Sequence, residues 1–219
     1  MQLTTKLSAA LLLALGSSTA FAAEAVNSEH QISGNIAVLS SYNSRGMTNS
    51  PENDKVTIQG GLDYSHASGF YAGYWGSTIG YSLTDYDDEV GDYTGSDTFE
   101  HDFYLGYNGS INADWGYNLG AVYYYYYESD ADADALESVL GVNYKNLSLT
   151  AQTLWNDVNW GNTGDTYVLA SYSHPLPRDF TLNTSLGISY YNDDTSKYFD
   201  TTEDFGFRHF TAGLSHPLG

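Results

Sequence analysis

The chain has 219 residues, with 7 Lys and Arg residues against 27 Asp and Glu residues, and it contains no cysteine. A formal net charge of −20 excludes nucleic acid as a partner, because phosphate binding needs clustered basic side chains. The lack of cysteine excludes disulfides and thiol chemistry. Tyrosine and glycine are abundant, at 21 and 22 residues, whereas disordered acidic chains are poor in aromatic residues.

The first element predicted along the chain is a secretory signal peptide, residues 1–22. Lys6 precedes the apolar run Leu7–Leu15, which is too short to span a bilayer, and Ala20-Phe21-Ala22 matches a small-residue cleavage site. We therefore expect export from the cytoplasm, cleavage after Ala22, and one domain over residues 23–219.

Ten strands are predicted in the rest of the chain, because apolar and polar residues alternate there with a period of two. In Val56–His66, for example, Ile58 and Leu62 share one parity, whereas Gln59 and Asp63 share the other. The predicted strands span residues 32–42, 56–66, 70–81, 99–107, 115–127, 136–144, 147–155, 166–173, 180–191 and 205–215.

The connections between these strands alternate in length. Short turns lie near Ser68, Gly109, Asn146 and Pro175, and longer connections, several of them rich in acidic residues, lie between the other neighbours. Short turns at one end and long loops at the other, joined by strands of about nine to eleven residues, are typical of an up-and-down outer-membrane barrel. The sequence therefore predicts an all-β, antiparallel transmembrane β-barrel in the outer membrane. Lipid is its expected partner, and lipopolysaccharide is expected around its acidic outer loops.

The C-terminal residues predict an incomplete barrel. The segment Ser215-His216-Pro217-Leu218 repeats the turn Ser173-His174-Pro175-Leu176, but no further strand follows it. An open sheet edge leaves backbone N–H and C=O groups unpaired in lipid. We therefore expect the sequence to lack a final hairpin. The alternative is direct closure of a ten-stranded barrel by its first and last strands.

Several segments resemble the TorF porin family of proteobacterial outer-membrane proteins. These are the signal peptide, SSYNSRGMTNS at Ser40–Ser50, QGGLDY at Gln59–Tyr64 and GFYAGYWGS at Gly69–Ser77, together with Glu100, Asp102 and Glu137. Family members usually carry an acid and an aromatic residue where Ser41 and Ser44 stand here, whereas Tyr42, Arg45 and Gly46 agree with the family pattern. The resemblance implies a Gram-negative outer-membrane barrel of about twelve strands, ten of them present here, with passage for small solutes.

The polar parity of the strands is predicted to face the lumen of the barrel. The candidate pore-lining residues are Arg45, Gln59, Asp63, Glu100, Asp102, Tyr104 and Glu137. Carboxylates in a lumen favour cations, so one hypothesis is a narrow, cation-favouring channel for small solutes. Because side chains largely fill so small a barrel, the alternative is a non-conducting structural or surface barrel whose acidic loops bind divalent cations or partners.

Arg45 is one of few basic residues and follows the first predicted strand. One role for it is a constriction charge that faces Glu100 or Asp102. The favoured role is structural: pairing with a carboxylate that holds the following loop in place.

Catalytic and metal-binding sites are not predicted. The sequence has neither a G-x-S-x-G nor an H-E-x-x-H motif, and His66, His174 and His216 fall at turns. The run Asp130-x-Asp132-x-Asp134 lacks the glycine and the bidentate glutamate of a calcium loop. We therefore expect no enzyme activity, no cofactor and no metal site.

A third hypothesis, a soluble secreted β-sandwich, requires the apolar parity to lie inside.

Overall fold

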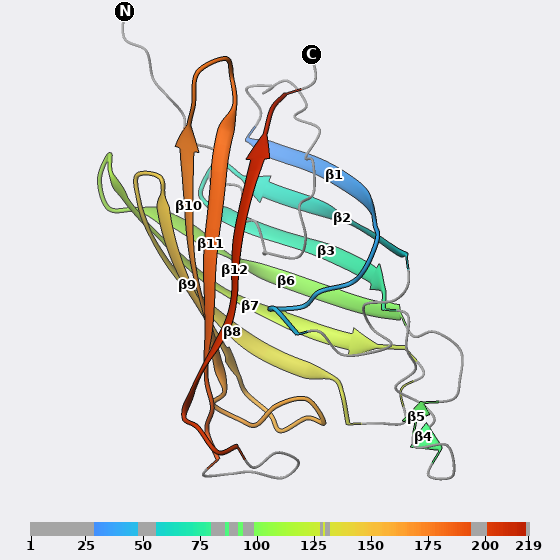
Figure 1. The fold of residues 1–219 in the computed structure, drawn as a ribbon. Coiled ribbons are helices and arrows are strands. Elements are labelled where there is room, and N and C mark those ends of the chain that lie inside the picture. Colours follow the sequence, from blue (N-terminus) through green and yellow to red (C-terminus); the bar gives the residue numbers. More distant parts are fainter. Residues whose placement is uncertain are drawn as a thin grey trace, which may run out of the picture.

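The structure is a computed structural model, and it describes residues 29–47, 56–79, 86–87, 92–93, 99–127, 129, 132–193 and 201–217. Its main element is one antiparallel sheet of ten strands (Figure 1). These strands are β1 (His30–Leu39), β2 (Thr57–His66), β3 (Phe70–Thr78), β6 (Phe99–Ser110), β7 (Trp115–Tyr126), β8 (Ala135–Tyr144), β9 (Leu147–Leu154), β10 (Thr166–Pro175), β11 (Thr181–Tyr190) and β12 (Phe205–Ser215). Two short strands, β4 (Tyr86–Asp87) and β5 (Asp92–Tyr93), pair only with each other.

The large sheet has up-and-down topology. Each of its strands pairs with the strand that follows it along the sheet, in the order β1-β2-β3-β6-β7-β8-β9-β10-β11-β12. The prediction of an all-β, antiparallel, up-and-down chain with ten main strands is confirmed. Strands β1 and β12 are the two edges of the sheet, so the alternative in which the first and last strands pair directly is not what the structure has.

The strand boundaries lie within three residues of the predicted ones; β6, for example, ends at Ser110 and not at Tyr107. Strand β1 ends at Leu39, whereas the first strand was predicted to continue to Tyr42. Strands β4 and β5 lie in a connection that was predicted to be a loop. The predicted signal peptide, residues 1–22, and most of the acidic connection between β3 and β6 lie outside the described residues.

The sheet curves strongly, which gives it a concave and a convex face (Figure 1). Side chains of the apolar parity lie on the convex face and are exposed, as Leu62 and Leu105 illustrate at 62% and 56%. Side chains of the polar parity lie on the concave face and are buried, as Glu100 and Asp102 illustrate at 3% and 1%. This arrangement is the reverse of a soluble sheet, which buries its apolar face.

The concave face also contains an apolar cluster near the ends of the strands that carry the long connections. Its buried members are Tyr42, Ile79, Val122, Tyr124, Tyr126, Ala133, Ala135, Val139, Leu154 and Val158. Trp75, Tyr104 and Trp160 pack against this cluster. The concave side at this end is therefore occupied by side chains. The described residues include no helix with the length and the apolar character needed to cross a bilayer.

Candidate functional site

The candidate site is a set of polar side chains that the sheet register brings into rows across the concave face. Asp63 of β2 pairs with Gly73 of β3, and Gly73 pairs with Tyr104 of β6. The same row continues through Val122 of β7 to Glu137 of β8. Since directly paired residues of neighbouring strands point to the same face, the row places two carboxylates and a tyrosine on one surface.

Arg45 reaches this surface from the segment that follows β1, residues 40–47. A backbone hydrogen bond from Met47 N to Ser44 O, 2.8 Å long, closes a turn around it. Arg45 and Gly46 both have positive φ angles, 51° and 74°. This left-handed backbone is costly for a non-glycine residue, so the surrounding contacts must hold it.

The contact that holds Arg45 is a two-pronged ion pair with Glu137. Arg45 Nη1 donates to Glu137 Oε1 at 2.8 Å, and Arg45 Nη2 donates to Glu137 Oε2 at 2.6 Å. The Glu137 side chain is 1% exposed and the Arg45 side chain 18% exposed. Such a parallel pair of charge-assisted hydrogen bonds is the strongest way for a guanidinium and a carboxylate to bind each other.

Two tyrosines complete the surroundings of the guanidinium. Tyr124 Oη accepts a hydrogen bond from Arg45 Nη2 at 3.0 Å and donates one to Glu137 Oε2 at 3.0 Å. The Tyr167 ring lies with its centroid 5.0 Å from Arg45 Cζ, within cation–π distance. Burial is the largest single effect and lowers the pKa of Arg45, but the Glu137 carboxylate and the Tyr124 and Tyr167 hydroxyls together raise that pKa above its ordinary value, so the side chain stays charged.

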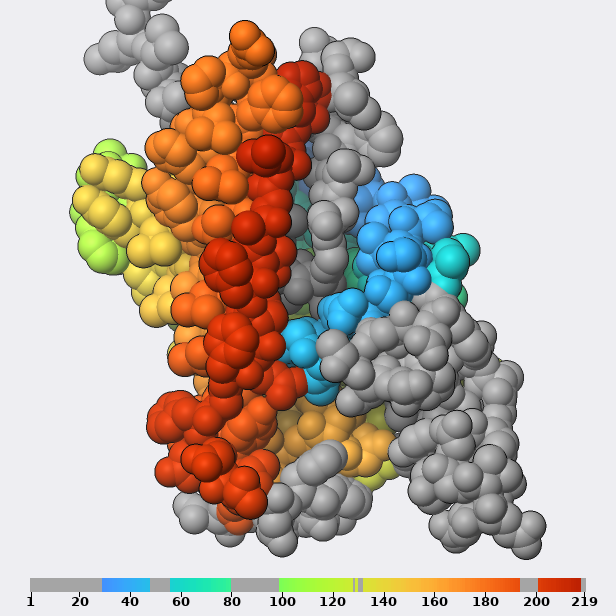
Figure 2. Space-filling view, in the orientation of Figure 1, coloured from blue at the N-terminus to red at the C-terminus, as the bar shows by residue number. Residues whose placement is uncertain are grey.

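The segment 40–47 is also attached to the opposite edge of the sheet. The register of β12 shifts by one residue between the partners of Gly187 and Ile188, which leaves Arg208 as a bulged residue. Arg208 Nε donates to the carbonyl oxygen of Arg45 at 3.2 Å, and Arg208 Nη1 donates to Tyr191 Oη at 3.0 Å. Figure 2 shows residues that follow β1 reaching the side chains of β12. A bulge can redirect a side chain in this way. Here the redirected side chain of Arg208 links the segment after β1, one edge strand, to β12, the other edge strand.

Glu100 and Asp102 lie on the concave face of β6, two residues apart. Glu100 Oε2 accepts a hydrogen bond from Tyr42 Oη at 2.7 Å. Neither carboxylate oxygen of Asp102 makes a hydrogen bond to any described residue. With Glu137, these residues place three buried carboxylates near the half-buried guanidinium of Arg45. Among the described residues, the interior therefore holds more carboxyl groups than basic groups.

The other candidate residues lie on the same face. Tyr104 Oη donates a short hydrogen bond to Asp63 Oδ1 across Gly73, whose lack of a side chain leaves room for the tyrosine ring. Gln59 is buried and belongs to the row of Glu100, with Ser77 of β3 between them. All seven residues proposed as pore-lining thus lie on the concave side.

The structural role predicted for Arg45, pairing with a carboxylate, agrees with its geometry, and the carboxylate is that of Glu137. Glu100 and Asp102, which the alternative constriction role placed opposite Arg45, do not form its ion pair. The sequence left the carboxylate unspecified because residues 40–47 cross to β8, and strand alternation carries no information on where such a segment goes.

Tyr42, Tyr124 and Tyr167 were not recognised as members of the site from the sequence. For Tyr124 a signal existed: the run Tyr123–Tyr127 alternates, and Tyr124 has the parity of Asn118, a polar residue of the same strand that is also buried. Tyr123 and Tyr127 have the other parity and are exposed.

Comparison with known protein families gives a match over most of the chain. Residues 22–216 match the family model described as "Bacterial protein of unknown function (Gcw_chp)". No curated protein matches the sequence, and no solved structure matches it either.

Proposed function

The chain belongs to the Gcw_chp family, a bacterial family of unknown function, and we propose that it is an outer-membrane β-barrel that gives small cations a narrow passage. The observation that carries this proposal is the distribution of polarity over the sheet. Convex-face residues such as Ile58 and Phe103 are exposed at 51% and 50%, while the carboxylates of the concave face are buried. Water does not favour such an apolar surface on a monomer, whereas hydrocarbon does.

The aromatic residues at the two ends of the strands support the same proposal. Trp115 and Tyr144 lie on the convex face beside short turns, with ring centroids 4.7 Å apart. Tyr123 and Tyr127 are exposed at the opposite end, near a long connection. Aromatic side chains gather at both membrane–water interfaces of outer-membrane barrels, because their rings are apolar and their polar atoms remain hydrated.

The preference for cations rests on the charge of the concave face. Glu100, Asp102 and Glu137 are buried there, and Arg45 neutralises Glu137 directly. Asp102 retains two carboxylate oxygens without hydrogen bonds to described residues. Carboxylates in a confined space attract cations and repel anions, because the field of each charge is weakly screened there.

Single-channel recording in planar lipid bilayers tests the proposal. Folded protein is expected to conduct, and a salt gradient is expected to give a reversal potential that favours cations. The double variant Glu100→Gln/Asp102→Asn is expected to lower this preference, whereas Asp114→Asn, at an exposed turn, is the matched control. Conduction that favours anions would contradict the proposal, as would a selectivity that the double variant leaves unchanged.

A second candidate function is a non-conducting barrel, and one observation favours it. Tyr42 is 2% exposed, and together with Arg45 it fills the concave side opposite β6 and β8. Folded protein that inserts into bilayers without any current would support this second function. Both functions require the protein to be in the outer membrane, and fractionation of the producing cells tests this location. Recovery of the protein in a soluble fraction would contradict both functions.

A further inference from the structure

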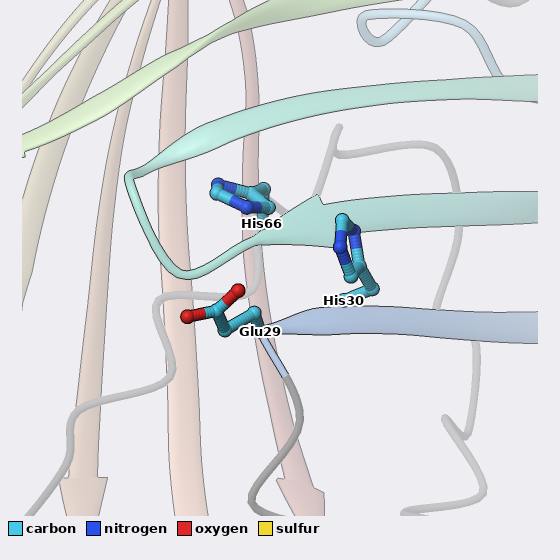
Figure 3. Close-up of side chains that lie close together, drawn as sticks. All are labelled: Glu29, His30 and His66. Carbon is cyan, nitrogen blue, oxygen red and sulfur yellow. The ribbon is translucent and has the colours of Figure 1, made fainter.

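Glu29, His30 and His66 lie together at the end of the sheet that carries the short turns, away from the site around Arg45 (Figure 3). One ligand atom from each side chain lies within 4.8 Å of the other two. We propose that these three residues bind a divalent transition-metal ion of the Zn²⁺ class. This site is independent of the proposed function, because it requires only the pairing of β1 with β2.

The sheet register places the two histidines. His30 is the first residue of β1 and is paired directly with His66, the last residue of β2. Directly paired residues have their Cβ atoms about 4.5–5.5 Å apart and point to one face, here the convex one. The two ring centroids are 4.9 Å apart. Both histidines are therefore held on one side of a rigid two-strand ladder.

Glu29 is held next to this pair by the backbone. Its carbonyl oxygen accepts a 2.8 Å hydrogen bond from Ala67 N, in the turn that follows His66. This bond extends the β1–β2 pairing by one residue beyond the ladder. It fixes the main chain of Glu29 beside the turn, so only the side-chain torsions of Glu29 must adjust to reach a metal ion.

An oxygen atom lies beside Nδ1 of each ring, so we assign Nε2 as the ligand atom of each histidine. His30 Nδ1 lies 2.8 Å from Tyr64 Oη, and His66 Nδ1 lies 2.8 Å from Ser68 Oγ. Metal-binding histidines commonly donate their other N–H to such oxygen atoms, which fixes the ring.

His66 needs one proton shift before it can bind a metal ion. Ser68 N–H donates to His66 Nδ1 at 3.1 Å, so the neutral ring of the metal-free protein holds its proton on Nε2. On metal binding this proton moves to Nδ1, the hydrogen bond from Ser68 N–H to Nδ1 is exchanged for one to water, and Ser68 Oγ accepts the new hydrogen bond from Nδ1–H. The freed lone pair of Nε2 then binds the metal, and the ring stays neutral throughout.

The donor set decides which metal ions are suitable. Two imidazole nitrogens and one carboxylate favour Zn²⁺, Cu²⁺ or Ni²⁺, whereas Ca²⁺ and Mg²⁺ prefer oxygen ligands alone. With Zn–N distances of about 2.0–2.1 Å, two ligands of a tetrahedral zinc ion lie roughly 3.4 Å apart. The ligand atoms lie within 4.8 Å of one another on two exposed side chains and one half-buried side chain, and small torsional changes bring them to that spacing.

Zinc titration of the folded full chain, prepared without a polyhistidine tag, tests the proposal. Isothermal titration calorimetry with Zn²⁺ alone is expected to give saturable binding of one ion per chain, which excess Mg²⁺ and Ca²⁺ do not displace. Co²⁺ is expected to give visible absorption bands that Zn²⁺ abolishes. The variants Glu29→Gln, His30→Ala and His66→Ala are expected to lose this binding, and Tyr64→Phe to weaken it about tenfold through loss of the bond to His30.

The control variant is His174→Ala. His174 is also an exposed histidine near a short turn, and its Nδ1 lies 3.2 Å from Tyr172 Oη, but it has no place in the cluster. It is expected to bind Zn²⁺ as the unchanged protein does. The proposal is overturned if the unchanged protein shows no one-to-one binding, or if His66→Ala protein with an unchanged circular dichroism spectrum binds Zn²⁺ equally well.

Discussion

Arg45 and Glu137 are joined by two parallel hydrogen bonds of 2.8 and 2.6 Å, although 92 positions separate them in the sequence. The bonds connect the segment after the first strand to β8, on the far side of the concave face. Arg208 holds the same segment to β12 through the carbonyl oxygen of Arg45. One arginine thus ties together the first edge, the middle and the last edge of the sheet.

The Arg45–Glu137 pair is expected to contribute strongly to stability. Either Arg45→Met or Glu137→Gln leaves a buried group without its partner, which costs about 3–5 kcal/mol of the free energy of unfolding. The double variant is expected to lose less than the sum of the two single losses. Urea-dependent unfolding in lipid vesicles, followed by tryptophan fluorescence, measures these values.

The matched control for this pair is an exposed one. Lys145 and Asp114 lie 3.7 Å apart, with side chains 56% and 51% exposed. Lys145→Gln is expected to leave the free energy of unfolding nearly unchanged, because water screens such pairs. An Arg45→Met variant as stable as Lys145→Gln would show that the buried ion pair does not hold the fold.

Gly46 is predicted to be essential for the attachment of its segment to β12. A Cβ atom at this position would lie 2.6 Å from Arg208 O and 2.8 Å from His209 Cβ, and the φ angle of 74° disfavours any side chain. Gly46→Ala is therefore expected to separate residues 40–47 from β12. Amide hydrogen exchange is expected to become faster in residues 40–47 and in β12. Gly213→Ala, also near this edge, is the control, because nothing lies within 4 Å of its Cβ position. Equal exchange in the two variants would contradict the prediction.

The hydrogen bond between Tyr104 and Asp63 is predicted to depend on Gly73. Tyr104→Phe removes a bond to a carboxylate and is expected to cost about 1.5–3 kcal/mol. Gly73→Ala places a methyl group where the Tyr104 ring lies and breaks the same bond. The two effects are therefore expected to be non-additive in a double-mutant cycle of urea unfolding. Full additivity of the two losses would show that Gly73 does not act through the bond between Tyr104 and Asp63. Tyr107→Phe, on the convex face, serves as the control.

The convex face offers a direct test of membrane insertion. Leu105 lies near the middle of β6, and Ile111 lies just beyond the end of that strand; both are exposed, at 56% and 65%. In a bilayer, Leu105→Arg is expected to destabilise the protein by about 2–4 kcal/mol and Ile111→Arg by about 0–1 kcal/mol, because the cost of a charge grows with its depth. Unfolding in lipid vesicles and heat-modifiable migration on gels measure the difference. In a water-soluble protein, both variants would be as stable as the unchanged chain.

The alternation of residue types determined much of this protein by itself. Side chains of a strand point to opposite faces in turn, so the order of apolar and polar residues specifies each strand and the face of every side chain. That is why the placement of Gln59, Glu100, Asp102 and Glu137 on one face, and of Leu62 on the other, could be predicted. Loop lengths added the order of the strands, since a short turn forces neighbouring strands to pair.

Only the tertiary structure decided which of these residues meet. Arg45 lies in a segment without periodicity, and its partner depends on how the sheet curves and on a bulge at Arg208. The pairing of His30 with His66 depends on the register of two strands whose connection is long. The sequence pattern of one strand specifies the face to which each of its side chains points. Contacts between distant residues depend in addition on how many strands and loops are arranged relative to one another.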